Sequence, residues 1–152
     1  MIEHARYRGI RVIPEFDSPG HVDSFGRTFP EFITTCWNDG KPFQGIYSKQ
    51  ATAEIFNPTV EELYPVLENF INELKSVFKD DYIHLGNDEV YYNCWKSNPN
   101  ITEWMNTMNF TEYNQLEAYY TNKLLKITNG LGRKATVWQD VYDNGVRVRK
   151  QN

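Results

Sequence analysis

The fold of this chain is decided by the stretch Tyr82-Ile83-His84-Leu85-Gly86 and by the segments on either side of it. Residues 82–85 form a short, mostly apolar run that a glycine stops, which is typical of a strand buried on both faces. Two similar runs, Ile10–Phe16 and Ala135–Trp138, predict two more strands. Because Pro14 donates no backbone hydrogen bond, it indicates a bulge or a break near the end of the first strand.

Helices are predicted between these strands. Apolar residues recur with helical spacing from Pro65 to Phe78 and from about Thr111 to Asn129, and a shorter helix is predicted over Ile101–Met108. The alternation of strands and helices predicts parallel pairing and an α/β fold in one domain. Three strands are too few to close a barrel or to protect both edges of a sheet.

The segment Ser18–Asn57 shows little regular pattern. A loop of this length inside a compact domain usually carries function. Because it follows a predicted strand, we expect it at the carboxyl end of the sheet, where α/β enzymes place their sites.

Composition excludes several classes of partner. The net charge of −4 argues against a nucleic-acid partner, which usually needs a basic face. No apolar stretch approaches the ~20 residues that span a bilayer. The start of the chain, Met1–His4, lacks the basic and apolar regions of a signal peptide.

Two cysteines, Cys36 and Cys94, occur together with two glycosylation sequons, which begin at Asn100 and Asn109. An even number of cysteines combined with sequons favours the secretory pathway.

Polar residues follow each predicted strand. Asp17 follows the first, Asp88 and Glu89 follow the second, and Gln139 and Asp140 follow the third. A parallel sheet brings these positions to one edge, where repulsion between carboxylates raises the pKa of some members and leaves a proton donor near neutral pH. The alternative is that these acids only cap helices or lie in solvated turns.

Other candidate residues also have two interpretations. His21 lies just past the same edge and either orients a carboxylate or has no role. Trp138 packs in the core or faces a pocket, where it can stack on a sugar, and His84 is interpreted as a packed residue. A divalent cation held by Asp17, His21, Asp88 and Glu89 is a competing hypothesis, although their spacing matches no ligand motif.

Several motifs resemble glycoside hydrolase family 20, the β-N-acetylhexosaminidases. The family's strand-and-loop signature resembles Arg8–His21, and its catalytic signature resembles His84–Val90. Cys94–Pro99 and Val137–Val141 are similar to the lysosomal hexosaminidases of animals and their eukaryotic relatives. The resemblance runs in order through nearly the whole chain and implies a partial (β/α)8 barrel, with about three central strands.

The resemblance also implies a mechanism in which the substrate assists. The sugar's own 2-acetamido oxygen attacks the anomeric carbon, Glu89 is the general acid and then the base, and Asp88 holds the acetamido N–H. His21 orients Glu89, Asp17 steadies Asp88, and Trp138 walls the acetamide pocket. The implied partner is a glycan with a terminal N-acetylhexosamine, and no metal or organic cofactor is expected.

The resemblance also implies that Cys36 and Cys94 form a disulfide, with two free buried thiols as the alternative. It further implies a lysosomal or extracellular location and a parent protein that forms a homo- or heterodimer. Most relatives have two glycines before the catalytic pair, whereas here Asn87 follows Gly86. A complete barrel takes ~250 residues. Residues 1–152 are therefore predicted to be an incomplete catalytic barrel, inactive alone. The alternative is a non-catalytic sugar-binding or interaction protein built on the same barrel.

Overall fold

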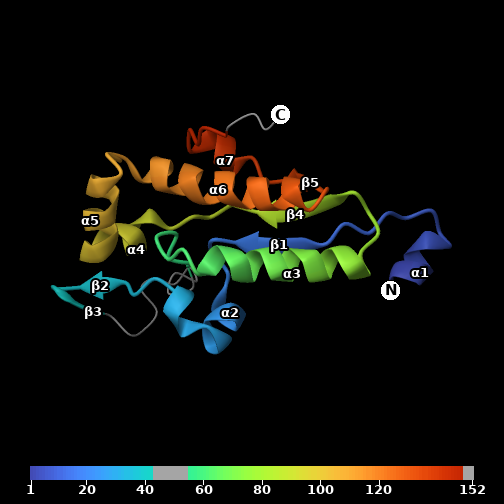
Figure 1. Ribbon diagram of the computed structural model, residues 1–152, viewed down its shortest axis with the longest axis horizontal. Helices are drawn as coiled ribbons and strands as arrows, with labels where there is room; N and C mark the ends of the chain where they lie inside the picture. Colours follow the sequence, from blue (N-terminus) through green and yellow to red (C-terminus); the bar gives the residue numbers. More distant parts are fainter. Residues whose placement is uncertain (43–54, 149–152) are drawn as a thin grey trace.

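A computed structural model describes residues 1–42 and 55–148 (Figure 1). Within these described ranges, no helix is long and apolar enough to cross a membrane. The elements, in chain order, are α1 (Ile2–Arg6), β1 (Glu15–Ser18), α2 (Asp23–Thr28), the 3-10 helix η1 (Pro30–Phe32), β2 (Trp37–Asn38), β3 (Lys41–Pro42), α3 (Leu63–Val77), β4 (Tyr82–Gly86), α4 (Tyr92–Ser97), α5 (Pro99–Thr107), α6 (Tyr113–Gly130), β5 (Lys134–Thr136) and α7 (Asp140–Asp143).

The central sheet has the order β1-β4-β5, and both pairings are parallel. In the first pairing Glu15 lies opposite His84 and Ser18 opposite Gly86, so β1 holds one extra residue between these points. Such a bulge re-aims the side chains beside it. The strands, connected through α3 and α6, give the α/β architecture that the sequence predicts.

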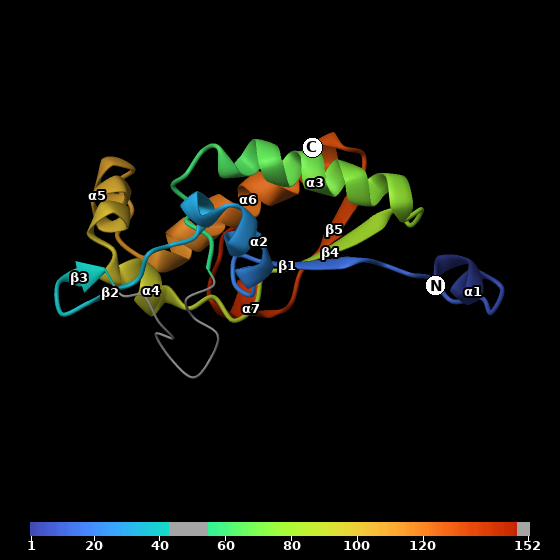
Figure 2. The same ribbon diagram turned by 90° about the horizontal axis from the view of Figure 1, so that it is seen from below.

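One face of the sheet packs against α3 and α6, which lie on the same side of it (Figure 2). Ile83 and Leu85 point toward the helices because alternate residues of a strand face the same side. Phe16 and Val137 pack against the same core. The core residues from the helices include Leu67 and Ile71 of α3 and Tyr120 and Leu124 of α6.

The opposite face of the sheet carries polar side chains, so the strands are not apolar on both faces as the sequence predicts. Glu15, which is exposed, and His84, which is half-buried, lie directly opposite each other on this face. Among the described residues, no helix packs against it as α3 and α6 pack against the other.

A second core cluster lies beyond the carboxyl ends of the strands. It is built around the Cys36–Cys94 disulfide, the pairing that the resemblance implies, and around Trp95, whose indole donates to the Phe56 carbonyl at 3.0 Å. The disulfide joins the segment that follows β1 to α4, which begins three residues after Glu89. Both sequon asparagines are exposed nearby, Asn100 in the first turn of α5 and Asn109 in the turn before α6.

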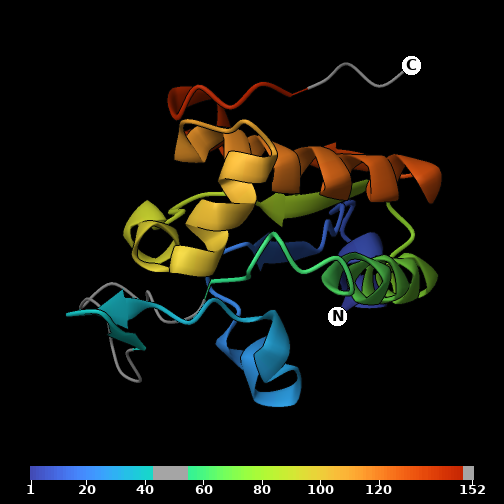
Figure 3. The ribbon, with the colours of Figure 1, turned by 60° about the vertical axis from the view of Figure 1, so that its left-hand side comes forward.

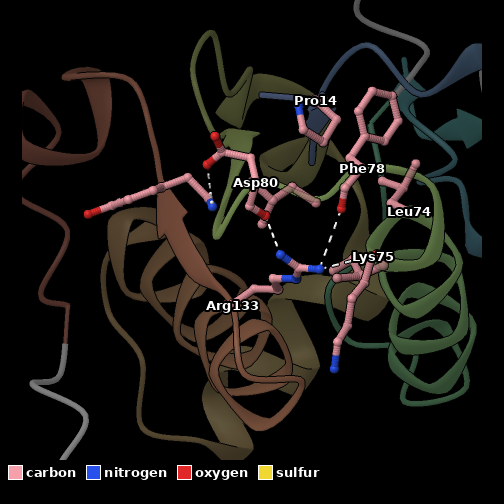
Figure 4. A pocket seen from close by; sticks show the side chains of 9 residues that line it. Pro14, Leu74, Lys75, Phe78, Asp80 and Arg133 are labelled. Atoms are coloured by element: carbon pink, nitrogen blue, oxygen red, sulfur yellow. Dashed lines mark hydrogen bonds between the residues drawn. The ribbon is translucent and has the colours of Figure 1, made fainter. Parts of the chain in front are cut away.

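The amino ends of the strands form a separate structural cluster. Arg11 donates two hydrogen bonds of 2.8 Å to Asp80, and these bonds hold the pKa of Asp80 at about 2. Arg133 donates to the carbonyls of Asp80, Lys75 and Phe78 beside a small cavity (Figure 4). We assign no site to this cavity, because this end of a barrel generally serves stability.

Other predictions about local structure are also wrong. The third strand, predicted over Ala135–Trp138, is found as Lys134–Thr136. The first strand begins at Glu15, not at Ile10. Among residues 10–14 of the described chain, only Pro14 has a backbone hydrogen bond to the sheet, in which its carbonyl accepts the His84 N–H at 2.9 Å. The segment from Ser18 to Asn57 holds α2, η1, β2 and β3, so its described part is more regular than predicted. Residues 43–54 of that segment lie outside the described residues.

Candidate active site

The predicted site residues gather at the carboxyl ends of the three strands. Asp17 lies inside β1 and not after it as predicted, because the bulged pairing with β4 continues to Ser18. His21 comes after the end of β1, Asp88 and Glu89 come after β4, and Trp138 comes after β5. Figure 3 turns this end of the molecule toward the viewer, with α2, α4, α5 and α7 around it. The parallel sheet therefore gathers groups that lie more than a hundred residues apart in the sequence.

His21 and Glu89 are in direct contact. His21 Nε2 lies 2.9 Å from Glu89 Oε2. Both residues have left-handed backbones, with φ of 58° and 52°, which is uncommon outside glycine and occurs often at functional sites. Partial burial lowers the pKa of His21, but the hydrogen bond to Glu89 and the charge of Asp17 outweigh this, so the net pKa lies above the usual value for histidine.

Asp17 and Asp88 are electrostatically coupled beside Gly86. Burial raises the pKa of Asp17 to about 6, and the charge of Asp88 adds to this, while His21 opposes it. A Cβ at position 86 would lie only 2.0 Å from Asp17 Oδ1, and Gly86 has a φ of 66°, so this position requires glycine on two grounds.

Asp88 presents an unpaired oxygen. Its Oδ1 is buried and has no hydrogen-bond partner within the described chain. An acceptor of this kind costs free energy unless something satisfies it, so it is a candidate to accept a hydrogen bond from a ligand.

Asn87 fits the turn where a second glycine is usual. Its φ is 64°, a region that asparagine tolerates better than most residues. It is fully buried, and its backbone and side-chain nitrogens both donate to the Ser18 carbonyl, at 3.1 Å and 2.6 Å. The asparagine therefore joins the turn after β4 to the end of β1.

Trp138 is not part of the core, because 47% of its surface is exposed. Its indole Nε1 donates to Glu15 Oε1 at 3.1 Å, and its ring lies 4.7 Å from that of His84. His84 is half-buried against this indole, in keeping with its interpretation as a packed residue.

Sequence reasoning missed two supporting contacts. Asp140 Oδ1 accepts a long hydrogen bond, 3.4 Å, from the Glu89 backbone nitrogen. Glu15 bonds to Trp138, although nothing in the sequence marks Glu15 as special. The available signal was that side chains alternate between the two faces along a strand. This alternation places Glu15 on the same face as His84 once the pairing of β1 with β4 is known.

The competing metal hypothesis finds no support in the geometry. Within residues 1–42 and 55–148, no three side chains of His, Cys, Asp or Glu converge as a metal ion requires. The catalytic roles of Glu89, Asp88 and His21, and the sugar contacts of Trp138 and Asp17, stay predictions.

Comparison with known proteins decides the family. The model of the glycosyl hydrolase family 20 catalytic domain matches residues 1–152. The chain belongs to glycoside hydrolase family 20. Its three-stranded parallel sheet therefore corresponds to part of that family's catalytic barrel, as the resemblance implied.

Its family 20 relatives include subunits of β-hexosaminidases. The chain is 45% identical to Beta-hexosaminidase subunit alpha of Rattus norvegicus over 149 residues, 98% of this chain and 27% of that protein. It is 40% identical to Beta-hexosaminidase subunit beta of Homo sapiens over 152 residues, 97% of this chain and 26% of that protein. The chain thus spans about a quarter of the length of these relatives.

Solved structures show the same relation. A family 20 chitobiase from Flavobacterium johnsoniae superposes with a TM-score of 0.75 and 26% identity, over 92% of this chain and 21% of that one. A family 20 exo β-N-acetylglucosaminidase from Vibrio harveyi, solved with N-acetylglucosamine, gives a TM-score of 0.72 and 25% identity, over 90% and 21%.

Proposed function

We propose that this chain supplies the catalytic pair of a β-N-acetylhexosaminidase, which hydrolyses terminal non-reducing N-acetylglucosamine or N-acetylgalactosamine with retention. The proposal depends on the difference between two adjacent carboxyl groups. Glu89 is in contact with His21, whereas Asp88 Oδ1 is buried and has no hydrogen-bond partner among residues 1–42 and 55–148.

In the first step the acetamido carbonyl oxygen attacks the anomeric carbon, and the bond from that carbon to the leaving oxygen breaks. The proton of the Glu89 carboxyl group passes to the leaving oxygen, so the products are an oxazolinium ion and an alcohol. Glu89 suits this role because its side chain is 70% exposed to an arriving substrate and yet is fixed by His21.

Asp88 acts on the other side of the same sugar. Its buried Oδ1 accepts the acetamido N–H, which turns the carbonyl oxygen toward the anomeric carbon, and its charge offsets the positive charge that develops. The two roles need adjacent residues, because the leaving oxygen and the acetamide lie on neighbouring ring carbons.

In the second step water attacks the anomeric carbon from the side that the leaving group vacated. The Glu89 carboxylate takes the proton of that water, and the oxazolinium ring opens to restore the amide. Two inversions at one carbon give net retention.

The remaining residues support this pair. His21 orients Glu89, Asp17 steadies Asp88, and Trp138 forms a wall for the acetamide. We further propose that the 152 residues act within a complete barrel, called here the full-length protein, and are inactive alone. Its expected setting is the secretory pathway, in a lysosomal or extracellular location, as a homo- or heterodimer; the disulfide supports an oxidising compartment.

The test is made on the full-length protein with two chromogenic substrates, one with a 2-acetamido group and one with a 2-hydroxyl group on the same ring. We expect turnover of the acetamido substrate only, with the β-anomer appearing first by NMR. Equal turnover of both substrates, or first appearance of the α-anomer, contradicts the mechanism. Calorimetric binding of N-acetylglucosamine without any turnover would instead establish a non-catalytic sugar-binding protein.

A further inference from the structure

The side chains of Glu15, His84 and Trp138 form a group on the face of the sheet that points away from α3 and α6, two of them from β1 and β4 and the third from the segment just after β5. Glu15 of β1 lies opposite His84 of β4, and His84 lies opposite Thr136 of β5, two residues before Trp138. Because alternate residues share a face, Trp138 reaches the same side as the other two.

Two contacts fix the Trp138 indole. Its Nε1–H donates to Glu15 Oε1 at 3.1 Å, a bond to a carboxylate and hence roughly twice as strong as one between neutral groups. The His84 ring lies against the indole, with centroids 4.7 Å apart and planes inclined by 56°. The hydrogen bond therefore sets the rotation of the indole, and the His84 ring packs against it from one side.

His84 is itself held in place. Its Nδ1 accepts the Gly86 backbone N–H at 3.1 Å and lies 3.6 Å from Glu15 Oε2. The hydrogen bond from Gly86 connects His84, and through its ring the Trp138 indole, to the turn that carries Asp88 and Glu89. An exposed indole without such contacts would sample several rotamers, and it could not form a wall of fixed position.

We propose that Glu15 and His84 are positioning residues that fix the indole of Trp138 and so set the room for the substrate's N-acyl group. The proposal rests on the proposed function, in which Trp138 walls the acetamide pocket. It predicts that the enzyme selects small N-acyl groups through Glu15 and His84, neither of which acts on the reacting atoms.

The test compares Glu15→Ala, Glu15→Gln and Glu73→Ala in the full-length protein, with 4-nitrophenyl glucosaminides that carry N-acetyl or N-butanoyl groups. Glutamine keeps an acceptor oxygen, and Glu73 is an exposed carboxylate on α3 that serves as the control. For Glu15→Ala we expect a ~10-fold rise in KM for the N-acetyl substrate and a ~10-fold loss of discrimination between the two acyl groups. Glu15→Gln should stay within ~3-fold of wild type, and Glu73→Ala should be unchanged.

If Trp138→Ala alters the discrimination between acyl groups but Glu15→Ala does not, the positioning role is wrong. The proposed function is unaffected by that result. Absence of turnover by the wild type defeats the proposed function instead. In that case the contact is tested by hydrogen exchange at the Trp138 indole N–H in the full-length protein. The exchange rate should rise at least ~10-fold in Glu15→Ala but not in Glu15→Gln, and an unchanged rate overturns the inference.

Discussion

His21 Nε2 lies 2.9 Å from Glu89 Oε2, although the two residues are 68 positions apart and belong to segments that follow different strands. This contact fixes a side chain that is otherwise 70% exposed. An exposed glutamate loses several rotamers when it is held, so in the proposed mechanism His21 prepares Glu89 for proton transfer before the substrate binds.

Replacing His21 by alanine should therefore lower kcat more than it raises KM, because the contact orients the reacting carboxyl group and not the sugar. We expect a loss on the order of 10-fold to 100-fold in kcat. Steady-state kinetics of the full-length protein test this, with His4→Ala as the control because His4 is exposed in α1, at the opposite end of the molecule. A change confined to KM contradicts the orienting role.

Asp88→Asn should weaken binding of a thiazoline mimic of the oxazoline intermediate. The asparagine keeps the size of the side chain but loses the charge that stabilises the cationic ring, and a charged hydrogen bond is worth ~1.5–3 kcal/mol, or ~10-fold to 100-fold in Kd. Calorimetry gives the affinity, with the exposed Asp39→Asn as a matched control. Equal affinities in Asp88→Asn and wild type would remove Asp88 from this role.

Glu117 gives a prediction about pH. This carboxyl group is fully buried in α6, where it accepts hydrogen bonds from Tyr92 and Asn144, and burial raises its pKa to about 7. The folded state therefore binds the Glu117 proton more tightly than the unfolded state does, and stability falls as pH rises from about 4.5 through about 7.

Glu117→Gln should remove that part of the pH dependence, which is at most on the order of 3 kcal/mol. Denaturant unfolding of the full-length protein at pH 4.5 and pH 8 measures it, with the exposed Glu73→Gln as the control. Asp17, whose pKa is raised to about 6, contributes with the same sign and stays in both variants. A pH dependence unaltered by Glu117→Gln would show that this carboxyl group does not titrate in that range.

The Cys36–Cys94 disulfide should contribute about 4 kcal/mol to stability, because it closes a loop with a sequence separation of 58. Cys36→Ser/Cys94→Ser should unfold at lower denaturant concentration and should not respond to added reductant. The reduced wild type should match the double variant. A wild type whose midpoint is the same with and without reductant contradicts the prediction.

The sequence was a good guide to the elements that bury apolar side chains with a clear period. The helix predicted over Pro65–Phe78 is found as Leu63–Val77, and the strand at Tyr82–Leu85 is one residue longer. Hydrophobic periodicity reports burial, so it works where one face is packed. It failed at Ile10–Ile13, where apolar residues occur but Ile10 and Ile13 are exposed.

The sequence predicts that the candidate site residues lie together, but it does not predict which of their side chains are in contact. Their places near the carboxyl ends of strands, Asp17 within β1 and Asp88 and Glu89 after β4, put them at one end of the sheet. The left-handed turns at His21, Asn87 and Glu89 decide which side chains meet, and several residue types can adopt such turns. Contacts such as Trp138 to Glu15 depend on register, which a single strand does not encode.

The proposed role of Glu89 as proton donor is tested most directly by the activity of Glu89→Gln in the full-length protein. Two N-acetylglucosaminides are compared, one with a poor leaving group and one with a dinitrophenyl group. We expect a loss of ~10²–10⁴ in kcat/KM for the substrate with the poor leaving group, because that group needs the proton. The loss should be much smaller for dinitrophenolate, which leaves without one, and the exposed Glu68→Gln should behave as wild type. Wild-type activity in Glu89→Gln, or an equal loss with both substrates, would contradict the assignment of Glu89 as the proton donor.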